Sequence, residues 1–385
     1  MKNISPLVIY YHSVAPDYFE GWPFKFLTHK LQDFEDQLVY LKKHRIATVF
    51  LDRWLAIRRG ETMLENKEVC LTLDDGFLDN WVYVFPLVKK YKMRITLFVA
   101  PECIDPNEAV RPTLEDVWNG KCQLSDLEGR GFVNWSELKI MHESGLVDIQ
   151  SHTMSHDKYI ASPEISSFYY GGANGVYPIW NAVPGIKLRY MKDDQFTSRL
   201  SWGTPLFKEE SAATVRKHTI NPEFIQEAAS LAKKFDLSNL EYRATYEQEI
   251  KELHQTYHRK HQLIASIESA DDYQKRLEYE VVDSKKIIEE KLQKPVHFLC
   301  WPHGDNTQEA HDLAKKTGYL ATTSGKMTNE ADKNDRIPRI GAVWRHSRWL
   351  NKQKIHYKLA SHYRQQPFYA IWLANEFKNQ MLNKN

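Results

Sequence analysis

The chain has 385 residues, 42% of them hydrophobic, which is enough for one large domain with additions or for two domains. Its 52 basic and 50 acidic residues leave a net charge of +2, so bulk electrostatics argue against nucleic acid as a partner. No window is long and apolar enough for a membrane span, and the first apolar run is too short for a signal peptide, so we expect a cytoplasmic protein. Four widely spaced cysteines predict buried thiols and no disulfides.

Short apolar runs alternate with amphipathic helices along the first third of the chain. This pattern is typical of βα units around a parallel sheet. We expect strands at residues 7–11, 48–51, 69–73, 95–99 and 147–150, and helices at 31–43, 80–91 and 134–145. The pattern returns late in the chain, with helices at 270–291 and 308–316 and strands at 296–300 and 320–323.

Residues 158–269 interrupt the alternation and are interpreted as a largely helical insertion. Its first half is rich in aromatic residues and glycine, which predicts an ordered loop, and residues 222–268 are charged and helical. The predicted organisation is an α/β domain split into residues 1–157 and 270–343, the insertion at 158–269, and a basic, aromatic, helical tail at 344–385.

Two acidic residues and two histidines follow predicted strands. Asp74 and Asp75 end a buried strand, where adjacent carboxylates repel each other unless a cation compensates, although an isolated Asp-Asp-Gly is usually a turn. His152 and His156 follow a second strand, and reactive residues of parallel α/β folds gather at the carboxyl ends of strands. One oxygen and two nitrogens for a metal, with a carboxylate left over as base, indicate a metal-assisted hydrolase.

The runs T-L-D-D-G-F at residues 72–77 and S-H-T-M-S-H at 151–156 resemble the first two motifs of the polysaccharide deacetylases, carbohydrate esterase family 4. The resemblance implies a distorted (β/α) barrel with a divalent metal, usually Zn²⁺, that removes N-acetyl or O-acetyl groups from sugars. Carried over by motif position, it implies that Asp75, His152 and His156 bind the metal and that Asp74 is the general base.

The run F-L-C-W-P-H-G-D at residues 298–305 resembles the third motif of that family. There an arginine often steers the base, and a backbone N–H after the proline helps to hold the oxyanion, a role that falls here on the turn Pro302, His303 and Gly304. Cys300 occupies the arginine position, as in a branch with a W-P-x-G motif that includes biofilm exopolysaccharide deacetylases. Arg339 is the candidate to orient Asp74 instead, with a surface salt bridge as the plainer alternative.

The general acid is the least defined part of the predicted site. The leucine-x-histidine motif of the family cannot be placed, and His12, in Y-Y-H-S-V after the first strand, is the leading substitute. A structural role for His12 is equally open, and His303 is a weaker candidate for the acid. Tyr177 and Trp180 offer rings that could stack on a sugar or serve only for packing.

Basic and aromatic residues interleave over residues 344–377. They suit a peripheral contact with an anionic membrane, although a helix packed on the barrel is favoured. The predicted function is a metal-dependent deacetylase for an N-acetylated sugar of a surface polysaccharide or of its lipid- or nucleotide-linked precursor. Alternatives are an O-deacetylase, a deformylase, another amidase, or a catalytically decayed glycan-binding protein of the same fold. The oligomeric state is left open.

Overall fold

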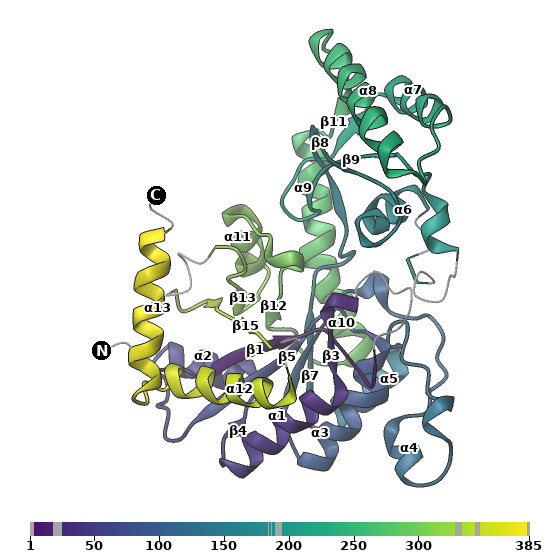
Figure 1. The fold of residues 1–385 in the computed structure, drawn as a ribbon. Helices are drawn as coiled ribbons and strands as arrows, with labels where there is room; N and C mark the ends of the chain where they lie inside the picture. The colour runs from purple at the N-terminus through teal and green to yellow at the C-terminus, as the bar shows by residue number, and fades with distance from the viewer. Residues whose placement is uncertain are drawn as a thin grey trace.

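A curled parallel sheet forms the centre of the protein (Figure 1), for which a computed structural model describes residues 4–17, 25–183, 185, 187–188, 195–327, 333–342 and 347–382. Its strands are almost entirely buried on both faces, which explains their continuous apolar sequences. In spatial order they are β14 (Arg336–Ile337), β13 (Ala321–Thr323), β12 (Phe298–Leu299), β7 (Val147–Ser151), β6 (Ile95–Val99), β5 (Glu68–Leu73), β1 (Leu7–Tyr11) and β15 (Ile340–Gly341), with β4 (Ala47–Thr48) beside β5.

The two edges of this sheet are joined by one short segment. β14 pairs in parallel with β13, and β15, which is separated from β14 by two residues, pairs in parallel with β1. Residues 336–341 thus act as one closing strand that contacts one edge with its first half and the other edge with its second. This closure confirms the predicted distorted (β/α) barrel.

Helices surround the barrel because each carries an apolar face that must be buried. The predicted helices at 31–43 and 308–316 are confirmed to the residue, and the helix capped by Asn134 has the expected capping box with Glu137. The predicted strand at 48–51 is partly wrong, because the chain leaves the sheet after Thr48 and Leu51 begins a helix. The surrounding elements are α1 (Leu31–Lys43), α2 (Leu51–Arg58), η2 (Asn80–Val84), α3 (Phe85–Tyr91), α4 (Leu114–Trp118), α5 (Trp135–Glu143), α9 (Ala270–Glu278), η8 (Tyr279–Asp283), α10 (Ser284–Leu292) and α11 (Gln308–Lys316).

Short elements connect these units at the edge of the barrel where the strands end. β2 and β3 pair in parallel with each other beside the first strand, and the others are single turns. They are β2 (Ser13–Ala15), η1 (Lys25–Leu27), β3 (Thr28–Lys30), η3 (Pro101–Cys103), η4 (Leu124–Asp126) and η9 (Pro302–Gly304).

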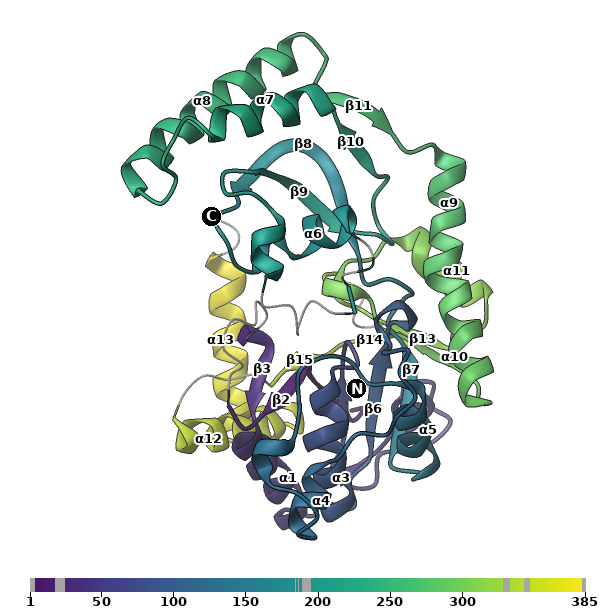
Figure 2. The same cartoon turned by 90° about the vertical axis from the view of Figure 1, so that its right-hand side faces the viewer.

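The insertion is a mixed α/β unit that stands above the barrel (Figure 2). The loop predicted for the first half of the insertion is wrong over residues 158–168, which form a long strand paired with β9. Pro163 and two register shifts had hidden the strand pattern. A separate apolar cluster, centred on Phe224 and Tyr246, holds the unit together. Its elements are β8 (Lys158–Phe168), η5 (Ala173–Gly175), α6 (Val176–Ala182), η7 (Phe196–Arg199), β9 (Pro205–Ser211), β10 (His218–Ile220), α7 (Pro222–Ala232), α8 (Leu240–Arg259) and β11 (Ile264–Ile267).

The tail forms two helices with different surroundings. α12 (Arg348–His362) packs on the barrel, where Ile355 and Leu359 join the main core. α13 (Phe368–Leu382) extends past it, with Trp372 36% and Phe377 66% exposed (Figure 1). Packing on the barrel, the favoured expectation for the tail, therefore describes the first helix only. Among the described residues, no helix is long and apolar enough to cross a membrane.

Candidate active site

The two sequence motifs meet at the carboxyl edge of the sheet. β6 lies between β5 and β7, so Asp74 and His152 emerge from strands that are two places apart. The main chain of the edge is tied across strands, because the His152 N–H donates to Val99 O at 2.8 Å and the Asp74 N–H donates to Tyr11 O at 3.0 Å. The predicted convergence of the motifs is therefore a direct result of strand order.

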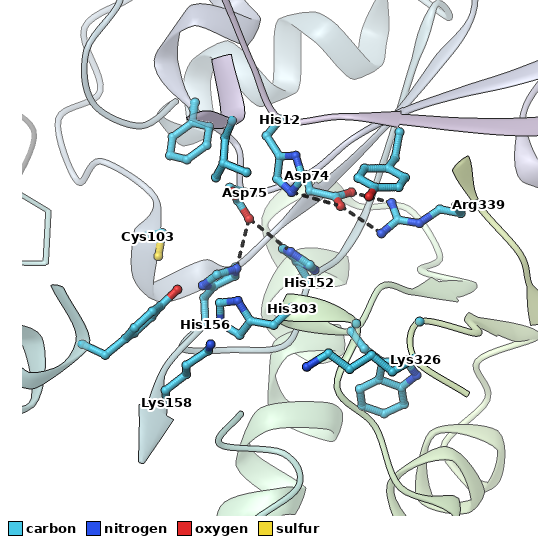
Figure 3. A pocket seen from close by; sticks show the side chains of 18 of the residues that line it. His12, Asp74, Asp75, Cys103, His152, His156, Lys158, His303, Lys326 and Arg339 are labelled. Atoms are coloured by element: carbon cyan, nitrogen blue, oxygen red, sulfur yellow. Dashed lines mark hydrogen bonds and ion pairs between the residues drawn. The ribbon is translucent and has the colours of Figure 1, made fainter. Parts of the chain in front are cut away.

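Asp75, His152 and His156 point at one another in the way that ligands of a single cation do (Figure 3). Both Nε2 atoms lie 3.1 Å from Asp75 Oδ1, and that buried oxygen meets no donor with hydrogen-bond geometry among the described residues. A buried carboxylate oxygen left in this state between two imidazoles is what a bound metal would satisfy. The donor set of two nitrogens and one oxygen suits Zn²⁺.

Neighbouring groups fix the two histidines. His152 Nδ1 lies 2.9 Å from Cys300 O, and since a carbonyl only accepts, Nδ1 carries the proton and the Nε2 lone pair is free for a metal. Ser155, which precedes His156, donates from its side chain to the Glu280 carboxylate. Glu280 also accepts the backbone N–H groups of Met154 and Ser155, so it holds the loop between the two histidines.

Backbone strain concentrates at the same place. Asp75, Thr153, His156 and His303 all have a positive φ, between 57° and 75°, which residues with side chains seldom adopt. Such strain persists only where surrounding contacts enforce it, and it is common at functional sites. The side-chain directions of the candidate metal ligands Asp75 and His156 thus depend on a strained main chain.

Arg339 contacts the remaining carboxylate in a bidentate pair. Its Nη1 lies 2.7 Å from Asp74 Oδ1 and its Nη2 lies 2.9 Å from Oδ2, with Nη2 also 2.9 Å from Cys300 Sγ. The two side chains are only 12% and 3% exposed, so the surface salt bridge considered from the sequence is wrong. Arg339 reaches Asp74 from the closing strand and lies against Cys300, where the family motif would place its arginine.

The charges around Asp74 keep it ionised. Burial by itself would raise the pKa of Asp74, but Arg339 first, then His152 and His12, outweigh it and hold that pKa below its ordinary value. The pKa of Asp75 is held lower still, because nearby His156 outweighs its burial. Both carboxylates are therefore anions at neutral pH.

His12 and His303 lie on opposite sides of the predicted metal ligands (Figure 3). His12 Nε2 is 3.8 Å from Asp74 Oδ2, and burial lowers its pKa against the pull of both aspartates. His303 packs edge-on to His156, with 4.7 Å between ring centroids, and burial lowers its pKa well below the ordinary value. His303 is thus kept neutral, while His12 touches the base.

The turn at residues 302–304 follows β12 directly. Gly304 has a φ of 72°, and its carbonyl accepts the Lys326 N–H at 2.8 Å. A Cβ added at Gly325 would lie 2.1 Å from that carbonyl oxygen, so the loops after β12 and β13 approach closely only because both residues are glycine. Pro302 is buried and is not among the residues that line the cavity.

A cavity of about 480 Å³ collects these side chains. Tyr177 and Trp180 of α6 line it, so the insertion supplies one wall, and their rings lie 5.4 Å apart in an edge-to-face arrangement. Sequence reasoning did not select Lys158 or Lys326, which also line it; each is a single lysine without a motif. The lining residues are Tyr10, His12, Phe26, Leu27, Asp74, Asp75, Phe77, Ala100, Cys103, Phe132, His152, His156, Lys158, Tyr177, Trp180, Trp301, His303, Gly304, Ser324, Gly325, Lys326 and Arg339.

Comparison with curated proteins finds distant relatives of one kind. Poly-beta-1,6-N-acetyl-D-glucosamine N-deacetylase from Escherichia coli (strain K12) is 20% identical over 318 residues, which are 82% of this chain and 34% of that protein. The protein of the same name from Escherichia coli O157:H7 matches equally. The chain spans about a third of the length of the curated relatives it matches.

Two solved structures are also similar to this chain. A de-N-acetylase from Aggregatibacter actinomycetemcomitans has a TM-score of 0.48 at 18% identity, with 82% of this chain and 86% of that chain covered. IcaB from Ammonifex degensii has a TM-score of 0.45 at 16% identity, with 92% and 96% covered. Residues 62–176 match the family model described as polysaccharide deacetylase, and this segment contains Asp74, Asp75 and both candidate metal-binding histidines. Over this segment the chain is similar to the polysaccharide deacetylases.

Proposed function

We propose that this chain is a metal-dependent N-deacetylase that hydrolyses the acetamide of an N-acetylated sugar in a polysaccharide or in its lipid- or nucleotide-linked precursor. The observation that carries the proposal is the convergence of three ligand atoms beside a separate carboxylate, Asp74, that Arg339 holds by both oxygens. The names of the curated relatives, which are N-deacetylases of an N-acetylglucosamine polymer, support the same reaction class.

Asp75, His152 and His156 would hold the divalent cation, with Zn²⁺ the expected ion. When bound, it would supply a Lewis acid for the acetamide carbonyl and make a water molecule acidic enough to attack. Asp74 is ionised and lines the cavity beside these ligands, so it accepts the proton of the attacking water as general base.

His12 is the proposed acid for the leaving amine, because it lines the cavity and lies 3.8 Å from the Asp74 carboxylate. The turn at Pro302, His303 and Gly304 is proposed to present a backbone N–H to the developing oxyanion. Tyr177 and Trp180, on the wall supplied by α6, are proposed to stack on the faces of the sugar. Acetate and a free amino sugar are the products.

Acetate release from N-acetylglucosamine oligosaccharides tests the proposal. The Zn²⁺-loaded protein should release acetate, and Asp74→Asn should reduce the rate at least a hundredfold while the variant still binds metal. Release of formate from a formamido sugar, or of acetate only from O-acetylated sugars, would identify the alternative hydrolases instead. Binding of sugar without turnover, unchanged in Asp74→Asn, would mean a glycan-binding protein and would overturn the proposal.

Location is a separate proposal. We propose a cytoplasmic enzyme that contacts the inner face of an anionic membrane through α13, whose exposed apolar residues include Ile371, Trp372 and Phe377. The preceding helix α12 carries the basic residues Lys352 and Lys358, of which Lys352 is paired with Asp36.

A further inference from the structure

Lys158 is a partly desolvated cation in the wall of the cavity. It begins β8, and its backbone carbonyl accepts from Asn181 at 2.8 Å, so the main chain at this position is fixed against α6. Its Nζ lies over the Tyr177 ring, 5.4 Å from the centroid. The cation therefore faces the same space as the candidate metal ligands.

No carboxylate lies within 4 Å of Lys158 Nζ in the part of the chain that the structure describes. The acidic groups that influence it, Asp305 and Glu209, act from a greater distance. Asp305 is instead paired with Lys326, whose own side chain is 70% exposed. A charge taken out of water without a nearby counter-charge costs free energy. An anionic group of a ligand beside Lys158 would supply this counter-charge and reduce that cost.

The geometry adds two further positive or donor groups around the same space. Figure 3 shows the amino tips of Lys158 and Lys326 on the side of the metal ligands opposite His12, next to His303. His303 Nε2 is buried and has no hydrogen-bond partner among the described residues, and its ring lies 5.3 Å from that of Tyr177. Lys158 supplies an ammonium with no paired carboxylate among the described residues, Lys326 supplies a second ammonium that Asp305 already contacts, and His303 supplies a buried ring nitrogen that can hydrogen-bond to an anion.

We infer that the substrate is an N-acetylated sugar that carries an anionic group, a carboxylate or a phosphate, which binds between Lys158 and Lys326 beside His303. The inference rests on the proposed N-deacetylase function and adds the charge of the substrate. A neutral sugar would leave Lys158 without the counter-charge that its surroundings lack. The acetamide would face Asp74, and the anionic group would face the insertion.

Matched sugars test the inference. The kcat/KM for acetate release is measured with N-acetylglucosamine, N-acetylglucosamine 6-phosphate, nucleoside-diphosphate-linked N-acetylglucosamine and N-acetylmuramic acid. Each sugar is tested with the unmodified protein and with Lys158→Met, Lys158→Arg and Lys326→Met. At least one anionic sugar should be preferred over N-acetylglucosamine by tenfold or more. Lys158→Met should reduce this preference at least tenfold, Lys326→Met less, and Lys158→Arg should retain most of it. Lys251→Met, at an exposed position of α8, is the control and should leave kcat/KM unchanged for both neutral and anionic sugars.

The outcomes separate the inference from the proposed function. Absence of acetate from every sugar would overturn the proposed function. Calorimetry on protein treated with a chelator still tests the charge preference, because tenfold tighter binding of the phosphate or the carboxylate sugar is expected without turnover. A preference for only one of these anions identifies the group. Equal kcat/KM and equal binding for neutral and anionic sugars, or an equal loss for both in Lys158→Met, would overturn the inference.

Discussion

Replacing Arg339 by methionine would test how the general base is positioned. The substitution keeps much of the apolar stem but removes both hydrogen bonds to Asp74, at 2.7 and 2.9 Å. Hydrogen bonds to charged groups contribute about 1.5–3 kcal/mol each, so two bonds correspond to about 10²–10⁴ in rate if their full effect falls on the base. We expect kcat/KM for acetate release to fall within that range, and the free energy of unfolding to fall by about 3–5 kcal/mol, because a buried carboxylate loses its partner.

The pH profile and two further variants make this prediction specific. Because Arg339 lowers the pKa of Asp74, the acid limb of the profile should move to higher pH in Arg339→Met. Arg348→Met breaks a pair with Asp36 in which the arginine is 55% exposed, so it should change stability by at most about 1 kcal/mol and leave activity unchanged. Cys300→Arg combined with Arg339→Ala should recover part of the lost activity. If Arg339→Met behaved like Arg348→Met in both assays, the assigned role of Arg339 would be wrong.

Three other predictions follow from separate features. Zn²⁺ at 100 times its Kd should stabilise chelator-treated protein by about 2.7 kcal/mol in thermal unfolding, and Asp75→Asn should lose this gain; equal stabilisation of both would place the metal elsewhere. Burial lowers the pKa of His29 to about 4, whereas the unfolded chain has a pKa near 6.5 at this residue. Between these pH values the unfolded state binds one more proton than the folded state, so a fall in pH favours unfolding. Stability should therefore drop by about 2 kcal/mol between pH 7 and pH 5 through this group, and urea titrations of His29→Gln should lack that part of the slope. Trp372→Ser should weaken co-sedimentation with vesicles containing anionic lipid, whereas Trp118→Ser, an exposed tryptophan on α4, should not; equal binding by both would exclude α13 as the contact.

The fold and the candidate metal ligands could be predicted because their signals are local. Asp74 and Asp75 follow the buried strand β5, and His152 follows β7, so the rule that parallel strands end at one edge brings them together. The loop predicted for the first half of the insertion failed over residues 158–168 for a local reason too, since Pro163 interrupts the alternation that would have revealed a strand.

Arg339 was predicted only as a candidate partner of Asp74, beside a surface salt bridge as the alternative, and the other partners could not be predicted because they come from distant parts of the chain. Arg339 is 265 residues from Asp74, and only the closing of the barrel brings it there. Glu280, which holds the loop between the histidines, lies 125 residues from Ser155 on a π-helical turn. Lys158 carries no motif at all, and only its place beside Tyr177 distinguishes it from the other lysines.

The closing strand at residues 336–341 also bears on how the protein matures. Arg339 can reach Asp74 only after both halves of this strand have paired, one with β13 and the other with β1. A nascent or partly folded chain with an open barrel would contain both histidine and aspartate motifs yet lack an oriented base. Under the proposed function, hydrolysis should therefore require this pairing, and recovery of activity on refolding should report closure of the barrel.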